Sequence, residues 1–379
     1  MLKHTQLTVS GDRFLVTYAI EAPIDGAREI ASKICVEQTV EFPPDLVADD
    51  DIRHHIFGRI ERMESISRSR QIAIISYAIE TTAHSIPQLI NVIYGNVSLF
   101  PMVRVERFQL PESLAASFAG PRFGRAGLRQ LLAQEHGPLF MTALKPQGLS
   151  AGDLAAQAYE LAIGGIDVIK DDHGLSDQPF ARFQERVVRC AAAVAEANVK
   201  TGGRCIYAPM ISSPSERLFD DIQFAKRSGA RGVLMAPGLV GFDVMRRVAG
   251  SDEIGLPVIA HPAFLGSYVA SATNGLAHYA LFGQLMRLAG ADATIFPNYG
   301  GRFSFSSDEC AQIVASCVDK MNHFKSILPA PGGGMTFESI PSMAAFYGRD
   351  VMYLIGGDLH RRGSLAESSR KLRELATSQ

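Results

Sequence analysis

The sequence predicts an α/β protein in which an N-terminal α+β domain of the ferredoxin-like type precedes a (β/α)8 barrel. From about residue 138 onward, short apolar runs alternate with longer amphipathic stretches, as strands and helices alternate in βα units. Eight such apolar runs are present, and a (β/α)8 barrel has eight strands. The first ~130 residues differ, because their apolar residues alternate singly with polar ones, as in half-exposed strands.

The N-terminal domain is expected to cover residues 1–125. Its strands are predicted at 13–20, 72–79 and 102–110, and its helices at 26–35 and 85–94. Proline and glycine cluster between Gly120 and Gly127, and these residues mark turns and linkers. We therefore place the boundary there and expect the barrel domain over residues 126–379.

The barrel domain begins with the first apolar run after this boundary. Its strands are predicted at 138–144, 166–170, 204–210, 232–236, 256–261, 291–296, 327–330 and 351–355. The stretches 151–163, 180–197 and 215–228 are rich in alanine and leucine with interspersed charges, as the outer helices of a barrel are. An open doubly wound sheet would show the same alternation, so these patterns alone leave two architectures open.

The composition excludes several classes of protein. The 379 residues are 47% hydrophobic and 20% charged, and the formal net charge of −2 gives no basic surface for nucleic acid. The five cysteines show no CxxC spacing, which favours reduced thiols and a cytoplasmic location. No apolar stretch has signal-peptide length or approaches the ~18 residues of a membrane span, so no membrane partner is expected.

Two lysines stand at the ends of successive predicted strands. Lys145 ends one apolar run, and the next run ends in Lys170, Asp171, Asp172 and His173. A lysine beside acids at a buried strand end is costly unless it is compensated. The ends of parallel strands form the active-site face of a barrel, so both lysines are candidates for catalysis. A solvated lysine in an acidic turn, or a structural salt bridge between Lys170 and Asp172, is the alternative.

These residues belong to a longer pattern. The runs KPQGLS (145–150), GGIDVIKDD (164–172) and QPF (178–180) together resemble the central signature of the Rubisco large-subunit superfamily. Further matches follow the order of that family along nearly the whole chain: Glu37 with Thr39, YGNV (94–97), Phe118 with Gly120-Pro121, His261, Gly332-Gly333 and Gly356-Gly357. The resemblance favours the barrel over the open sheet and implies the α+β domain before it.

The resemblance also implies a metal site. In the family, the lysine at the position of Lys170 reacts with CO2, and the resulting carbamate binds Mg²⁺ together with the aspartate at Asp172. A glutamate follows in the family, whereas this chain has His173, a softer ligand that would bind Mg²⁺ more weakly or act as an acid or base. Lys145 matches a lysine that acts as general base or acid near the enolisable carbon, and His261 matches a histidine that contacts the sugar.

Other positions depart from the family in ways that argue against CO2 fixation. The family's phosphate-binding arginine after His261 is Pro262 here, and the loop after the sixth strand lacks the family's histidine and lysine. Arg302 is the candidate to supply a catalytic positive charge at a similar place, although a guanidinium is a poor geometric substitute for an ammonium group. Two glycine pairs follow the last two strands and are expected to bind a phosphate through their backbone N–H groups: Gly332, Gly333, Gly356 and Gly357. Pro331 replaces the family's serine before the first pair, so one phosphate is expected rather than two.

Glu37 and Asn96 match positions that reach into the neighbouring subunit's barrel, so the resemblance implies a homodimer or a larger homo-oligomer. The chain is most similar to the Rubisco-like (form IV) members, which enolise or isomerise phosphorylated keto sugars such as 5-methylthioribulose 1-phosphate in methylthioadenosine salvage. One alternative is a decarboxylase of a 3-oxo sugar-acid phosphate, of the 3-oxo-isoapionate 4-phosphate type. The other is a non-catalytic scaffold or regulatory protein.

Overall fold

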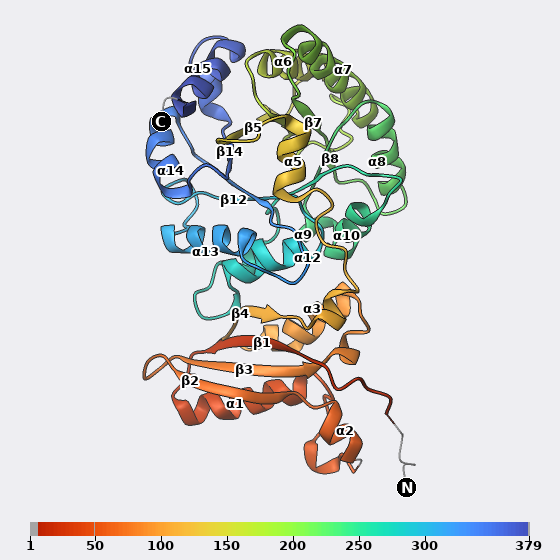
Figure 1. Cartoon of the computed structure of the whole chain (residues 1–379), viewed down its shortest axis with the longest axis vertical. Coiled ribbons are helices and arrows are strands. Elements are labelled where there is room, and N and C mark those ends of the chain that lie inside the picture. Colours follow the sequence, from red (N-terminus) through yellow and green to blue (C-terminus); the bar gives the residue numbers. More distant parts are fainter. Residues whose placement is uncertain (1–6, 49, 378–379) are drawn as a thin grey trace. The chain divides into compact units, whose positions relative to one another are not determined.

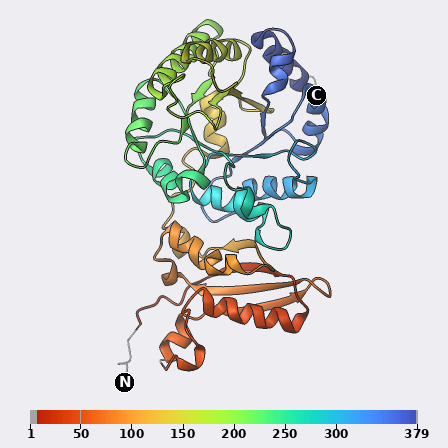
Figure 2. The same cartoon turned by 180° about the vertical axis from the view of Figure 1, so that it is seen from behind.

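The computed structural model describes residues 7–48 and 50–377, which form two compact units. The first unit contains the chain up to Ala119 together with segments 265–285 and 320–323, and the second contains the rest. Figure 1 and Figure 2 show the elements of each unit from opposite sides. The first unit thus takes in two segments from the second half of the sequence.

The first unit is an α+β fold built on a five-stranded sheet in the order β11-β4-β1-β3-β2. The pairs β1–β3, β1–β4 and β2–β3 are antiparallel, and β1-α1-β2-β3-α3-β4 follow one another as in a ferredoxin-like domain. The strands are β1 (Arg13–Ile20), β2 (Arg59–Ser65), β3 (Gln71–Ala78), β4 (Val103–Gln109) and β11 (Gly275–Leu276). The helices are α1 (Ile24–Glu37), α2 (Asp50–His55), α3 (Ile86–Tyr94), α4 (Glu112–Ala115) and α11 (Gly266–Val269), with a π-helix at Tyr279–Leu285. The predicted α+β fold is confirmed.

The strand β2 was not predicted from the sequence. Its seven residues, RIERMES, carry four charged side chains and contain no buried residue. It lies at the edge of the sheet, where only one neighbour is needed and charged side chains discourage further pairing. Its polar composition therefore reflects its edge position, which hydrophobic alternation cannot reveal.

The second unit is a nearly closed parallel barrel, as predicted. Its nine strands follow the order β7-β6-β5-β14-β13-β12-β10-β9-β8, and β7 and β8 are two halves of the third predicted strand. The strand is interrupted at Pro209, which has no N–H to donate to a neighbour. The strands are β5 (Leu139–Leu144), β6 (Val168–Asp171), β7 (Ile206–Ala208), β8 (Met210–Ile211), β9 (Val233–Met235), β10 (Val258–Ala260), β12 (Ala293–Pro297), β13 (Leu328–Gly332) and β14 (Met352–Leu354).

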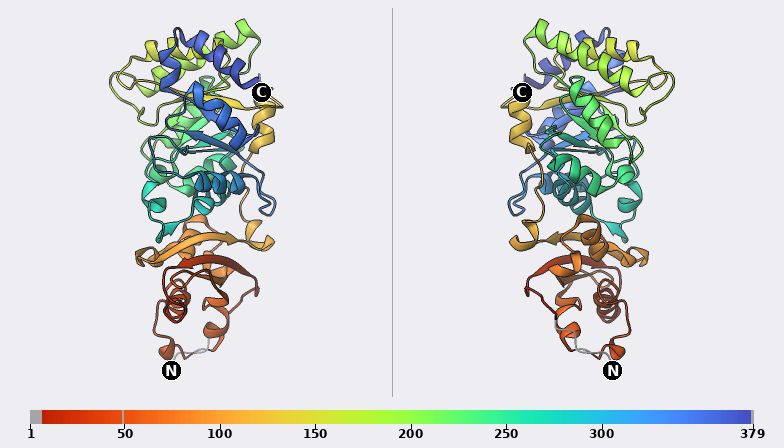
Figure 3. Two further views of the ribbon diagram at one scale, coloured as in Figure 1. Left: turned by 90° about the vertical axis from the view of Figure 1, so that its left-hand side faces the viewer. Right: turned by 90° about the vertical axis from the view of Figure 1, so that its right-hand side faces the viewer.

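Helices surround the barrel strands, as Figure 1 and the two side views of Figure 3 show. The helix α6 begins at a capping box formed by Ser150 and Asp153, and α13 begins at another formed by Ser306 and Glu309. Among the described residues, no helix is long and apolar enough to cross a membrane. The helices are α5 (Gly124–Leu132), α6 (Ala151–Ile163), α7 (Phe183–Thr201), α8 (Leu218–Arg227), α9 (Pro237–Val240), α10 (Phe242–Gly250), α12 (Met286–Leu288), α13 (Ser307–Val318), α14 (Ile340–Tyr347) and α15 (Leu365–Thr377).

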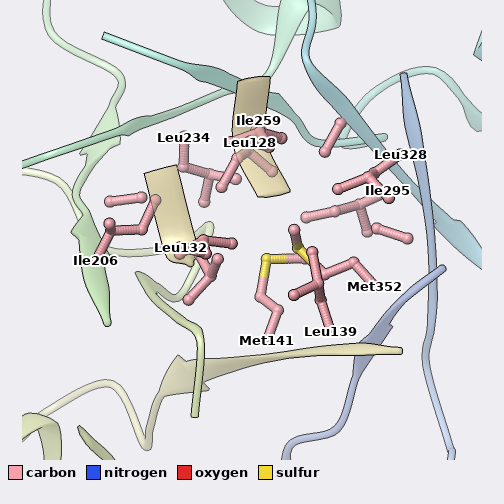
Figure 4. Close-up of a cluster of buried hydrophobic side chains, with 14 of the residues drawn as sticks. Leu128, Leu132, Leu139, Met141, Ile206, Leu234, Ile259, Ile295, Leu328 and Met352 are labelled. Atoms are coloured by element: carbon pink, nitrogen blue, oxygen red, sulfur yellow. The ribbon is translucent and has the colours of Figure 1, made fainter. Parts of the chain in front are cut away.

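The barrel core is filled by side chains from alternate strand positions and from α5. Leu128 and Leu132 of α5 lie in one buried cluster with Leu139, Met141 and other inward-facing strand residues (Figure 4). Because every second residue of a strand faces the same side, the positions that continue this inward series past Met141 include Lys145. The core pattern therefore predicts which side chains meet at the carboxyl ends of the strands.

Asp292 anchors the start of α5. Its carboxylate accepts backbone N–H bonds from Phe123 (2.8 Å), Gly124 (2.6 Å) and Val258 (2.9 Å). Burial raises the pKa of this carboxyl to about 6 from an ordinary value of 3.8, although the three hydrogen bonds oppose the shift. The stability that Asp292 contributes is therefore complete below about pH 4 and is lost as the pH rises through 6.

Replacing Asp292 with asparagine tests this assignment. The wild-type protein should be the more stable at pH 4.5, because the amide can accept fewer of the three N–H bonds. Its advantage in unfolding free energy should then shrink by on the order of 2–3 kcal/mol by pH 7, since only the wild type titrates. Urea denaturation of both proteins across this range measures the difference. A difference that stays constant with pH would contradict the raised pKa.

Candidate active site at the carboxyl ends of the barrel strands

Two lysines and a carboxylate converge where β5 and β6 end. Lys145 follows the last residue of β5, and its Nζ forms an ion pair with the Oδ1 of Asp172, which follows β6. The side chain of Lys145 is 41% exposed, whereas that of Asp172 is only 12% exposed. The strands β5 and β6 are paired in parallel with Ala143 opposite Lys170, so both lysines belong to the inward-facing series. The structure therefore brings together the three residues that the sequence predicted.

Lys170 is buried, with 2% of its surface exposed. Its Nζ donates a hydrogen bond to the backbone carbonyl of Asp171 at 3.1 Å. Burial, assisted by the nearby positive charge of Lys145, lowers the pKa of Lys170 to about 8, although Asp172 acts in the opposite direction. At this pKa roughly a tenth of the amine is neutral at pH 7, and the neutral amine is the nucleophilic form.

Asp172 remains ionised. Burial alone would raise the pKa of this carboxyl, but hydrogen bonds from His173 and Lys145 outweigh that effect and hold the pKa below its ordinary value. Nδ1 of His173 lies 3.5 Å from Oδ1 of Asp172. The site thus contains a permanent anion in contact with two groups that can carry protons.

Two histidines stack beside this carboxylate. The rings of His173 and His261 are nearly parallel, with an interplanar angle of 14° and 4.6 Å between their centroids. Nδ1 of His261 accepts the backbone N–H of Ala263 at 3.1 Å, which assigns the ring proton to Nε2. Burial lowers the pKa of His261 well below its ordinary value, and Lys170 and His173 lower it further. His261 is therefore a neutral imidazole that can donate a hydrogen bond from Nε2.

The donor set fits a divalent cation only if Lys170 takes part. Within residues 7–48 and 50–377, no three His, Cys, Asp or Glu side chains form a cluster that could hold a metal ion. Asp172 supplies one anionic oxygen ligand, and hard cations require several. A carbamate on the neutral amine of Lys170 would add two oxygens from the same strand end, with His173 beside them. The residues fit the metal that the resemblance implies, through a modified lysine.

The predicted phosphate-binding glycines separate into two kinds. A Cβ atom on Gly332 would lie 2.9 Å from the side chain of Leu354, so this glycine is required for packing of β13 against β14. Gly333 has a φ of +88°, which places it in the left-handed region that glycine tolerates. Around Gly356 and Gly357, a Cβ atom would meet nothing within 4 Å. The open space lies over these last two glycines, and there a phosphate could approach the backbone.

Arg302 lies on the exposed loop that follows β12. Its guanidinium carbon is 5.0 Å from the ring centre of Phe303, and its backbone N–H donates to the carbonyl of Gly333 at 3.4 Å. Gly301 packs against the same carbonyl, where a Cβ atom would lie only 2.3 Å from the oxygen. The loop is thus held against the glycine run after β13 by its backbone, and the guanidinium of Arg302 is stacked on its own neighbour.

Glu37 and Asn96 meet within the first unit. Nδ2 of Asn96 donates a hydrogen bond to Oε1 of Glu37 at 2.9 Å, although 59 residues separate them. Glu37 ends α1, and Asn96 follows α3. The sequence singled out both residues separately, and the fold makes them one polar pair at the surface.

For two polar residues of the second unit, Asp171 and Asn298, the sequence did not predict the partners that the structure shows. The side chain of Asp171 is buried and bound to Arg186 of α7, and that of Asn298 accepts a hydrogen bond from the phenol of Tyr347 at 2.6 Å. Each stands one position out of step with the inward-facing series of its strand. The two-residue period of the barrel strands could have identified them as residues that face the helices.

Comparison with known proteins gives a consistent result. Residues 124–367 match the family of the ribulose bisphosphate carboxylase large chain, catalytic domain. The chain is 38% identical over 352 residues to ribulose bisphosphate carboxylase-like protein 1 of Rhodopseudomonas palustris, covering 93% of this chain and 94% of that protein. It is also 38% identical over 349 residues to the 5-methylthioribulose-1-phosphate isomerase of Rhodospirillum rubrum, covering 92% and 91%. The crystal structure of a Rubisco-like protein from Rhodopseudomonas palustris has a TM-score of 0.85 at 35% identity, covering 97% of this chain and 98% of that one.

Proposed function

This chain belongs to the ribulose bisphosphate carboxylase large-chain family, and from that premise we propose that it enolises a phosphorylated keto sugar. The substrate we expect first is 5-methylthioribulose 1-phosphate, because a relative at 38% identity is named as the isomerase of that compound. The observation that carries the proposal is the convergence of Lys145 and a buried, partly neutral Lys170 on Asp172. Relatives at 29–31% identity named as 2,3-diketo-5-methylthiopentyl-1-phosphate enolases support the same class of reaction.

Lys170, Asp172 and His173 would hold Mg²⁺ in this proposal. The neutral amine of Lys170 attacks CO2, so that an N–C bond forms and one proton is released, leaving a carbamate anion. A divalent cation held there would supply Lewis-acid stabilisation for negative charge that develops on the substrate oxygen. Hydrogen bonding from His173 to Asp172 keeps the carboxylate ionised and ready to act as a ligand.

Lys145 is the proposed general base. It must first leave its ion pair with Asp172 and lose a proton, and it then accepts the proton from the carbon next to the carbonyl. His261 donates its Nε2–H to a substrate oxygen as a neutral imidazole, so it stabilises developing negative charge without surrendering its proton. The backbone N–H groups at Gly356 and Gly357 bind the phosphate and fix the distance from it to the reacting carbon.

Proton NMR in D2O tests the proposal directly. Purified protein with Mg²⁺ and bicarbonate is offered 5-methylthioribulose 1-phosphate, a 3-oxo sugar-acid phosphate, or ribulose bisphosphate with labelled CO2. Deuterium incorporation next to the carbonyl, or isomerisation, of the first compound is the expected result. Loss of CO2 from the second compound would favour the decarboxylase, and incorporation of label into the third would indicate a carboxylase. No change in any of them would overturn the enzyme assignment in favour of a scaffold.

Replacing Gly357 with alanine should weaken binding of the phosphate without harming the fold. The new Cβ would meet no protein atom, and Gly357 begins a short 3-10 helix, so alanine should leave the melting temperature unchanged or slightly raised. The methyl group would stand where the phosphate approaches, and KM should rise by roughly tenfold, about 1.4 kcal/mol, with a smaller change in kcat. Gly332→Ala is the contrasting control, because its Cβ would clash with Leu354 and lower stability. An unchanged KM for Gly357→Ala would place the phosphate elsewhere.

Glu37 and Asn96 are proposed to complete the active site of a second subunit. Glu37→Gln and Lys145→Ala should each be inactive as purified proteins. When the two are unfolded together and refolded as a mixture, mixed dimers should contain one site with both native residues, giving about a quarter of wild-type activity if subunits pair at random. Activity that stays absent in the refolded mixture, with dimers present by size-exclusion chromatography, would mean that each site is built from one chain.

A further inference from the structure

The carboxylate of Asp171 forms a buried network directly behind the candidate active site. Its Oδ1 accepts the phenol O–H of Tyr207 at 2.7 Å, and its Oδ2 accepts Nε of Arg186 and the backbone N–H of Met210, each at 3.1 Å. The side chains of Asp171 and Arg186 are both 0% exposed. A buried ion pair with this many hydrogen bonds is strongly disrupted when one partner is removed.

The network spans the interruption in the third barrel strand. Lys170 of β6 lies opposite Ala208, the last residue of β7, and Pro209 follows without an N–H to donate. Met210 then begins β8, which pairs with β9. The pairing of β6 with β7 ends at Ala208, and the backbone N–H of Met210 donates instead to the carboxylate of Asp171. The same carboxylate accepts the phenol of Tyr207, which belongs to β7. The side chain of Asp171 in β6 therefore forms hydrogen bonds with both β7 and β8.

We propose that Asp171, held by Tyr207 and Arg186, is a positioning residue that sets the geometry of Lys170 and Asp172. Successive residues of a strand point to opposite faces, so fixing the Asp171 side chain on the helix side directs its two neighbours to the barrel side. The backbone carbonyl of Asp171 also accepts the Nζ of Lys170 at 3.1 Å. This inference rests on the proposed function, because Lys170 and Asp172 are the proposed metal ligands.

A purely structural network would have a different consequence. Its loss would lower the stability of the protein but leave the affinity of the folded molecules for their ligands unchanged. A positioning network also holds the two ligands in register, and partners behind a metal ligand typically account for 10- to 100-fold in metal affinity. Ligand affinity measured per folded molecule therefore separates the two roles.

The variant Tyr207→Phe removes one donor from Asp171 and leaves its ion pair with Arg186 in place. The matched control is Tyr77→Phe in the first unit, where a buried phenol is hydrogen-bonded to that of Tyr18 at 3.0 Å. NMR with ¹³C-labelled bicarbonate detects the Lys170 carbamate as Mg²⁺ is titrated, and thermal denaturation gives the folded fraction. We expect Tyr207→Phe to require about tenfold more Mg²⁺ for half-maximal carbamate, with Tyr77→Phe close to wild type.

Equal Mg²⁺ requirements in wild type and Tyr207→Phe would overturn the positioning role. Asp171→Asn should show a larger shift than Tyr207→Phe if it folds, and Tyr207→Phe decides the matter if it does not. A wild-type protein that forms no carbamate at Lys170 would overturn the positioning role together with the metal site. A wild-type protein that forms the carbamate yet enolises no substrate would refute the proposed function alone, and the comparison of Mg²⁺ requirements would still decide the role of Asp171.

Discussion

Replacing Lys145 with methionine is expected to abolish deuterium exchange into the substrate, with a fall in kcat of roughly 10²–10⁴-fold, about 3–5 kcal/mol in activation free energy. Methionine keeps the unbranched apolar stem of the side chain but has no nitrogen to accept a proton. The fold should tolerate the change, since the side chain of Lys145 is 41% exposed and Asp172 keeps its contact with His173. Proton NMR in D2O and circular dichroism measure the two effects.

The control for this variant is Lys33→Met on α1. Lys33 forms an ion pair with Glu29 at 2.8 Å, and both side chains are more than 60% exposed. Removing this exposed pair should leave both the unfolding free energy and the deuterium exchange close to their wild-type values. If Lys145→Met retained exchange near the wild-type rate, the general base would have to be another residue, with His173 the first to test.

Replacing Lys170 with methionine should remove the bicarbonate and Mg²⁺ dependence of the protein and lower kcat by about 10³-fold or more. Asp172 and His173 alone do not form a metal-binding cluster among the described residues, so the proposed carbamate would be the ligand that completes the set. The buried position suits an apolar side chain better than an amine whose pKa is already lowered to about 8 by burial. The melting temperature should therefore stay level or rise. Titration calorimetry with Mg²⁺ and differential scanning calorimetry measure both expectations.

This variant also distinguishes the structural salt bridge that the sequence left open. If Lys170 served only to neutralise Asp172, methionine would leave a buried carboxylate with one fewer cation and would lower stability. The amine is bonded to a backbone carbonyl, while Nζ of Lys145 pairs with Asp172. A marked loss of melting temperature with an unchanged response to Mg²⁺ would contradict the carbamate assignment and favour the structural role.

Local pattern was sufficient to locate the strands of the barrel, although not to distinguish a barrel from an open sheet. Strands in a parallel barrel are buried on both faces, so each reads as a short apolar run, and all eight predicted runs coincide with observed strands. The same pattern failed for β2, because an edge strand with an exposed face needs no apolar residues. It also predicted a single strand where Pro209 separates β7 from β8. The two are separate strands because β7 pairs with β6 whereas β8 pairs with β9, and pairing partners are not visible in an apolar run.

The sequence by itself determined which side chains meet at the active-site face. Lys145, Lys170 and Asp172 stand at the ends of adjacent strands with the inward-facing register, and parallel pairing brings such positions together whatever surrounds them. Only the tertiary structure decided their chemical states. Lys170 is buried, and His173 stacks on His261, a residue distant in the sequence. Asp171 is likewise held by hydrogen bonds from Arg186 and Tyr207, which come from other elements of the barrel. A pKa and a hydrogen-bond partner depend on solvent access and on neighbours within a few ångströms, and folding alone sets both.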